Sequence, residues 1–121
     1  MSIFQPKEWW SAKVGNNEEF DYNSVCVSNI DNDEQDCEPK IIVGSFEGFL
    51  RIYKPNRKGN HEYHVDDLVI EKNMELPILQ VSCGYFSSKH GDKLCLGVLS
   101  TRQLSIHKIV SEASHSTIED V

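Results

Sequence analysis

The sequence predicts an all-β fold: a partial β-propeller of about one and a half to two four-stranded blades, preceded by a short N-terminal helix. Apolar runs rich in β-branched and aromatic residues are bounded by turn residues, which favours strands. Residues 40–54 read KIIVGSFEGFLRIYK, and residues 93–108 repeat this pattern as KLCLGVLSTRQLSIHK at an offset of 53 to 54 positions. A period of roughly 40 to 50 residues or slightly more, with several strands per unit, is typical of propeller blades.

The predicted helix occupies residues 1–15 and docks on the blades. Pro6 suits a first helical turn, and Gly15 followed by two asparagines suits a stop. A helix below about 12 to 15 residues is marginal in water unless it packs on a surface. Trp9 and Trp10 are adjacent, so both cannot face the same way. We expect one to fill a core and the other to cap a surface or meet a partner.

The partial propeller occupies residues 16–110. Its first strands are predicted at 24–30, 41–43, 49–53, 68–70 and 78–81, after which the pattern begins again. Gly48 suits a hairpin turn that needs a positive φ, and Gly44 suits a close contact between blades.

The C-terminal residues 111–121 are polar and short of apolar residues, which predicts a disordered tail. The second unit therefore stops early, and the chain is expected to hold fewer than two full blades. Because closed propellers have about four to eight blades, the chain reads as the opening portion of a larger propeller.

Composition and charge argue against several classes of protein. Twelve basic and nineteen acidic residues give a net charge of −7, which disfavours nucleic acid and anionic lipid as partners. The N-terminus lacks the features of a secretory signal, which predicts a cytoplasmic protein. The four cysteines, Cys26, Cys37, Cys83 and Cys95, are then expected as thiols, and all except Cys37 as small buried hydrophobes.

Candidate metal and catalytic sites are weak. Closely spaced carboxylates at Asp31, Asp33, Asp36 and Glu38 invite a calcium site, but an EF-hand would need glycine and glutamate at positions where this chain has neither. His61 and His64 lack the further ligands that zinc requires.

A search for catalytic groups gives a similar result. The run GSFEG at 44–48 has its serine in the wrong place for a nucleophile elbow. We therefore expect no enzyme activity, no cofactor and no small-molecule substrate.

Four motifs in this chain resemble a known family. They are MSIF with the paired tryptophans in residues 1–10, EEFD at 18–21, the segment 40–53, and LPILQV at 76–81. They are similar to the N-terminal segment of the parathyroid-hormone-responsive BBSome subunit, the Bardet-Biedl syndrome protein nine family. The resemblance covers residues 1–108.

The resemblance implies a non-catalytic scaffold subunit of a coat-like complex that carries membrane proteins to and from the primary cilium. The implied partners are other BBSome subunits, and contact with the membrane is indirect. The implied locations are the cytoplasm, the cilium, the ciliary base and the ciliary membrane. Family members begin with a β-propeller and continue into further regions.

An interaction module is therefore the leading hypothesis, with Trp9, Trp10 and Phe46 as its contact residues, because a few aromatic anchors carry most interface energy. Two alternatives remain at this point. One is a calcium-binding, integrin-like propeller fragment, and the other is a stand-alone β domain that self-associates to cover its open edge.

Overall fold

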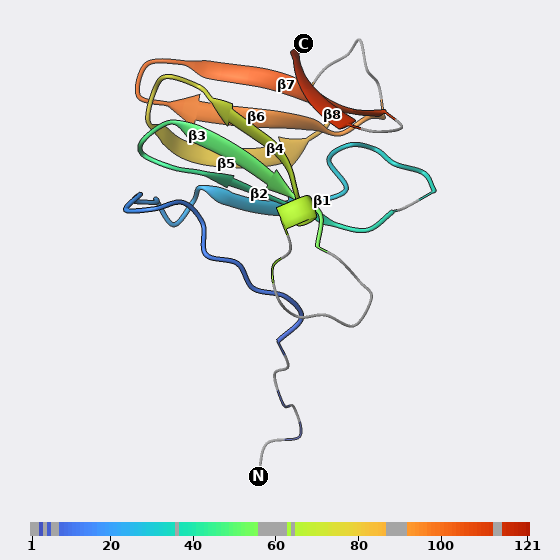
Figure 1. The fold of residues 1–121 in the computed structure, drawn as a ribbon. Helices are drawn as coiled ribbons and strands as arrows, with labels where there is room; N and C mark the ends of the chain where they lie inside the picture. The colour runs from blue at the N-terminus through green and yellow to red at the C-terminus, as the bar shows by residue number, and fades with distance from the viewer. Residues whose placement is uncertain are drawn as a thin grey trace.

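The computed structural model consists of two four-stranded antiparallel sheets that lie one above the other as layers (Figure 1). The residues it describes are 3, 5, 8–35, 37–55, 63, 65–86, 92–112 and 115–121. The all-β prediction is confirmed. Among these residues, no helix is long and apolar enough to cross a membrane.

The first sheet has the strand order β1-β2-β3-β4, so each strand pairs with the next one in the chain. Its strands are β1 (Val25–Ser28), β2 (Lys40–Gly44), β3 (Phe49–Tyr53) and β4 (Leu68–Asn73), with the short 3-10 helix η1 (Val65–Asp67) before β4. The turn between β2 and β3 closes through hydrogen bonds from the Gly48 N–H to the Ser45 carbonyl and from the Ser45 N–H to the Phe49 carbonyl, both 3.0 Å. Gly48 has φ 95°, as the sequence predicts for this turn.

The second sheet repeats this order with β5 (Ile78–Gly84), β6 (Cys95–Ser100), β7 (Leu104–Glu112) and β8 (His115–Asp120). The two sequence repeats therefore lie in equivalent hairpins, β2-β3 and β6-β7. The second sheet is complete, so the expectation that the second unit stops early is wrong.

The core lies between the two sheets, whose facing surfaces we call the inner faces. It is formed by aliphatic side chains from both sheets, namely Ile42, Leu50, Ile52 and Ile70 from the first and Ile78, Val81, Leu96, Val98 and Ile109 from the second, with Ile30 from the loop after β1. Opposite strand positions such as Ile42, Ile52 and Ile70 share a row across the first sheet, which gives that sheet a continuous apolar face.

Gly44 lets the sheets approach closely. A Cβ atom at this position would collide with the side chain of Ile78, which is itself fully buried. The Ile78 N–H also donates a hydrogen bond of 3.0 Å to the Ser45 carbonyl in the first sheet. The predicted role of Gly44 in a close contact between sheets is thus confirmed.

Asn32 forms a second polar connection between the sheets. Its side-chain oxygen accepts a hydrogen bond from the Leu94 N–H (2.8 Å), and its Nδ2 donates one to the Leu94 carbonyl (3.1 Å). The side-chain amide therefore binds both the N–H and the carbonyl of Leu94, as the backbone of a neighbouring strand would. Asn32 has φ 54°, a left-handed conformation that asparagine tolerates better than most residues.

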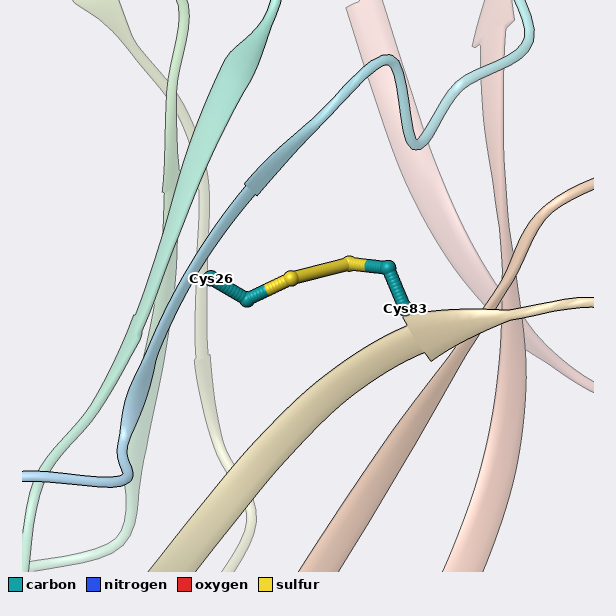
Figure 2. The surroundings of a disulfide bond; sticks show 2 residues. All are labelled: Cys26 and Cys83. Atoms are coloured by element: carbon teal, nitrogen blue, oxygen red, sulfur yellow. A yellow bond between two sulfur atoms is a disulfide. The ribbon is translucent and has the colours of Figure 1, made fainter.

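Cys26 of β1 and Cys83 of β5 are joined by a disulfide that crosses from one sheet to the other (Figure 2). The expectation of four thiols is therefore wrong for this pair, because stacking brings together two strands that are 57 residues apart in the sequence. Cys37 and Cys95 are free; Cys37 is exposed and Cys95 is buried, so Cys95 does fit the predicted role of a small buried hydrophobe.

The N-terminal docking helix predicted for residues 1–15 is not present in the described part of that segment. From residue 8 onward the chain is irregular and runs along the first sheet on the side away from the second sheet (blue in Figure 1). The physical reason is that Trp10 is held by Asp67, and Glu18, three residues beyond the predicted helix, is held by Arg51. These attachments lie at separate points on the first sheet, so the chain between them runs along the sheet instead of coiling.

The tail predicted as disordered over residues 111–121 instead contains the end of β7 and the whole of β8. Ile118 pairs with Ile109 and packs against the core. The strand is polar because it is an edge strand with one face in solvent, and this polar composition is what made it look disordered.

The repeat offers a matched test of the packing at Gly44. The variant Gly44→Ala should destabilise the fold by roughly 1–3 kcal/mol, because the added methyl group forces Ile78 to move in a filled core. Its repeat counterpart Gly97 is the control, since a Cβ there meets its nearest neighbour, Phe86, at 3.4 Å, an ordinary contact. Urea unfolding of both variants measures the difference. Equal effects at the two glycines would contradict this account of the stacking.

Candidate functional site

Trp10 lies in an aromatic cluster at the C-terminal end of β3. Its ring centroid is 5.5 Å from that of Tyr53 and 6.2 Å from that of Tyr63. Its indole N–H donates a hydrogen bond of 3.0 Å to the Oδ2 atom of Asp67, a buried residue of η1. Burial raises the pKa of Tyr53 above its usual range. Trp10 therefore fastens the N-terminal segment to the first sheet.

Arg51 forms a second attachment point on the same face of the first sheet. Its guanidinium binds both carboxylate oxygens of Glu18 at 2.9 and 2.8 Å, and its Nε donates to Glu71 at 2.9 Å. The hydrogen bonds that Arg51 donates to Glu18 lower the pKa of Glu18 and raise the pKa of Arg51. Arg51 is only 6 % exposed, so the pair is a buried, bidentate ion pair between the N-terminal segment and β3.

Phe46 lies in the β2-β3 turn and is half-buried. Its backbone N–H donates a hydrogen bond of 2.8 Å to the Glu19 carbonyl, so the turn is also held by the N-terminal segment. The Glu19 N–H in turn donates to the Glu47 carboxylate at 3.2 Å. The segment is thus bound at both ends of β3, near Phe46 and near Trp10.

The three predicted contact residues do not form one site. Trp10 and Phe46 lie at opposite ends of β3, and both contribute to holding the N-terminal segment. Trp9 is the most exposed of the three, at 46 %. The expectation that the two tryptophans face different surroundings is confirmed, and Trp9 is the more exposed of the two.

The acidic loop after β1 is tied to the first sheet by a buried lysine. Lys40 is 1 % exposed, and its Nζ lies 3.0 Å from the Oδ1 atom of Asp31 and 2.7 Å from the Oδ1 atom of Asn29. Asp36, which belongs to the calcium hypothesis, and His61 and His64 lie outside the described residues. Within the described residues, no group of three or more histidine, cysteine or acidic side chains is placed to hold a metal ion.

A polar chain joins β7 to β8 beside a hollow of about 450 Å³ at the outer rim of the two sheets. The Ser105 Oγ is hydrogen-bonded to the His107 Nε2 at 2.8 Å, and the His107 Nδ1 lies 2.9 Å from the Asp120 Oδ1. Burial lowers the pKa of His107, with Lys72 acting in the same direction and Asp120 opposing it. Hydrolases use this order of groups with an exposed serine and oxyanion donors. Here the histidine is only 4 % exposed, so this row of polar groups serves as a structural link between adjacent strands.

Sequence reasoning missed the polar groups that organise these surfaces. Arg51 stands in an apolar strand pattern, and its partner Glu18 lies in a segment whose path the sequence does not reveal. Asp120 fell in the predicted disordered tail, so its contact with His107 could not be foreseen. An arginine inside an otherwise apolar strand was the one available signal, because a buried arginine requires a carboxylate partner.

Comparison with known proteins gives a consistent result. Residues 1–120 match the family described as PTHB1 N-terminal. Over 110 residues, which is 90 % of this chain, the sequence is 41 % identical to Protein PTHB1 of Xenopus laevis and 40 % identical to Protein PTHB1 of Homo sapiens. The matched part is 13 % of the frog protein and 12 % of the human protein, so the chain spans only a small part of the curated relatives it matches.

Substitution of each tryptophan in turn should show that Trp10 stabilises the fold and that Trp9 contributes little to stability. We expect Trp10→Ala to destabilise the protein by about 2–4 kcal/mol, because it removes ring packing and the hydrogen bond to Asp67. Trp9→Ala should cost less than about 1 kcal/mol, because nearly half of the residue is exposed. Thermal unfolding of both variants measures this. A larger loss from Trp9 than from Trp10 would refute the assignment.

Buried His107 predicts a pH dependence of stability. The pKa of His107 is lower in the folded than in the unfolded protein. At pH values just below the ordinary pKa of histidine, the unfolded state therefore binds more protons than the folded state. Stability should therefore be full at pH 7.5 and fall toward pH 5.5. In His107→Gln the decline over this window should be smaller, whatever the variant's stability at pH 7.5. Urea midpoints at both pH values provide the comparison, and an unchanged decline would assign the effect to another group.

Proposed function

The chain belongs to the PTHB1 N-terminal family, and on that premise we propose that it is the opening part of a β-propeller that serves as a non-catalytic scaffold module of the BBSome. In this proposal each four-stranded sheet is one blade, and the module acts in ciliary membrane-protein trafficking and cilium assembly. It has no cofactor and no small-molecule substrate.

The observation that carries this proposal is the exposed apolar surface on the second sheet. We call the face of that sheet turned away from the first sheet its outer face. Leu50 of the first sheet is fully buried against the second sheet, whereas Leu104 of β7 lies on the outer face of the second sheet and is 68 % exposed. Leu99, which pairs with Leu104 across the strands, is 39 % exposed. Apolar residues of the first sheet are therefore covered by the second sheet, whereas these two leucines of the second sheet are uncovered.

A further sheet stacked on this outer face would bury these leucines as the second sheet buries Leu50. The opposite side of the molecule supports the same reading, because Val25 and Val27 of β1 are 53 % and 55 % exposed on the face of the first sheet turned away from the second. A stack of two sheets with an apolar surface at each end is the arrangement expected of a propeller segment. Surfaces of this kind associate with proteins rather than with nucleic acid in a chain of net charge −7.

The proposed partners are other BBSome subunits, reached through the outer face of the second sheet and through two aromatic residues, the exposed Trp9 and the half-buried Phe46. The proposed locations are the cytoplasm and, within the complex, the cilium, the ciliary base and the ciliary membrane. Contact with lipid is indirect, through the complex.

Self-association is the second candidate function, and the same leucines favour it. A second copy of the chain can cover the outer face with the exposed valines of its own first sheet, which extends the stack from one molecule to the next. The calcium-binding alternative has no comparable support, because Asp31 is already neutralised by Lys40.

A charge placed on the outer face tests the scaffold role. We expect Leu104→Asp to reduce co-purification of BBSome subunits with the tagged chain from ciliated cells by about tenfold or more, because an unpaired carboxylate would be buried at the contact. Val65→Asp is the matched control, since this aliphatic residue is 71 % exposed but belongs to η1, beside the first sheet. Thermal unfolding of the purified variants shows whether both are folded.

Three outcomes are informative. Loss of the subunits with Leu104→Asp alone supports the scaffold function. Equal recovery with both variants contradicts it. Concentration-dependent sedimentation of the wild-type chain that disappears in Leu104→Asp, without recovery of any BBSome subunit, replaces it with self-association.

A further inference from the structure

The disulfide between Cys26 and Cys83 is the only covalent connection between the two sheets apart from the main chain in the described part of the protein. Cys26 lies on β1 and Cys83 on β5, the first strands of their respective sheets, and the two side chains point toward each other across the gap between the layers (Figure 2). Both residues are partly buried at the margin of the core. The bond therefore joins the sheets along one side, whereas β4 and β8 meet on the other side without it.

The surroundings of this pair differ from those of the buried Cys95. Cys95 occupies the position that corresponds to Ile42, so it fills a place where the pattern requires an apolar residue. Cys26 and Cys83 instead pair across neighbouring strands with the core residues Ile42 and Leu96, so both lie on inner faces. Each therefore faces the opposite sheet, and the two side chains meet between the layers.

We propose that Cys26 and Cys83 form a reversible thiol–disulfide site that responds to cellular peroxide and glutathione and sets how firmly the first two sheets are held together. The inference rests on the cytoplasmic placement in the proposed function. In that compartment glutathione keeps most thiols reduced, and the disulfides that do form are usually transient or redox-sensing rather than structural.

The chemistry balances with two common cellular reagents. One cysteine thiolate attacks hydrogen peroxide, its sulfur is oxidised to a sulfenic acid, and hydroxide leaves. The second thiolate then attacks that sulfur, forms the disulfide and releases the oxygen as water, so two thiols and one peroxide give one disulfide and two waters. In the reverse direction, two molecules of reduced glutathione return two electrons, restore both thiols and leave as glutathione disulfide.

The two redox forms differ in the freedom of the first sheet. The closed loop spans 57 residues, so the oxidised form restricts the unfolded chain strongly and is the more stable form. The reduced form retains the Gly44 contact with Ile78 and the Asn32 pairing with Leu94, so it still folds. Reduction thus loosens the side where β1 meets β5 without dispersing the core.

The test is a redox titration of the purified chain. The protein is equilibrated in mixtures of reduced and oxidised glutathione and, separately, with hydrogen peroxide, and the free thiols are then alkylated and located by mass spectrometry. We expect Cys26 and Cys83 to become protected from alkylation together. Cys37 should still react with the alkylating reagent after treatment with mild peroxide. The melting temperature of the oxidised form should exceed that of the reduced form by roughly 10 °C or more.

Variants at each cysteine complete the test. Cys26→Ser and Cys83→Ser should each abolish the redox-dependent shift in melting temperature, and Cys37→Ser, which removes the exposed free thiol, should leave it intact. The wild-type titration needs no variant, so a folding defect in a mutant leaves the main result standing.

Two results would overturn the proposal. One is that both cysteines remain alkylated after peroxide, or that one of them pairs with Cys37 or Cys95. The other is that the bond persists at the glutathione ratios of the cytosol, which would make it a permanent structural link. Neither result depends on recovery of BBSome subunits, so failure of the scaffold proposal and failure of this one are distinguishable.

Discussion

The contact between Ile78 and Gly44 is the constraint on which the rest of the structure depends. Ile78 is the first residue of the second sheet, and its side chain occupies the space that any Cβ at Gly44 would take. This brings the backbones close enough for the Ile78 N–H to reach the Ser45 carbonyl. From that point the second sheet runs alongside the first, which allows the isoleucines of both inner faces to meet and places β1 next to β5. The core, the Asn32 pairing and the disulfide all require this distance between the layers.

The other face of the first sheet is governed by charge. Arg51 occupies the middle of β3 and is nearly buried, a position that is costly for a cation unless carboxylates surround it. Glu18 and Glu71 supply them, and Glu18 can do so only if the N-terminal segment lies across the sheet. The need to neutralise one arginine therefore fixes the path of a segment that has no regular secondary structure. Trp10 adds apolar contact at one end of that path and the Phe46 backbone adds a hydrogen bond at the other.

The sequence carried enough information for the strands but not for their surroundings. Turn residues and β-branched runs predict strands from local chemistry, and the repeat indicates two similar units. Both can be read from the order of residues along the chain. Register cannot. By analogy with Gly44, which pairs with Leu50, the repeat would set Gly97 opposite Leu104, yet Gly97 pairs with Ile106, because the length of the turn decides which residues face each other. The missing N-terminal helix, the ordered β8 and the paired cysteines share one cause. Each depends on contacts between segments far apart in the chain. Local features such as polar composition or short segment length gave the wrong prediction wherever such contacts determine the structure.

The two end surfaces of the stack are chemically different. The first sheet's outward face is partly covered by the N-terminal segment, which leaves the valines of β1 uncovered but occupies β3 with an ion pair. The outer face of the second sheet carries one exposed ion pair between neighbouring strands, Lys108 with Glu119 at 4.0 Å, and no chain segment is bound to it among the described contacts. Elsewhere on that face Phe86 lies over Gly97, beside the exposed leucines. The second end surface therefore exposes leucines and one aromatic side chain, whereas the first is shared with a segment already bound. The second is the less restricted of the two surfaces.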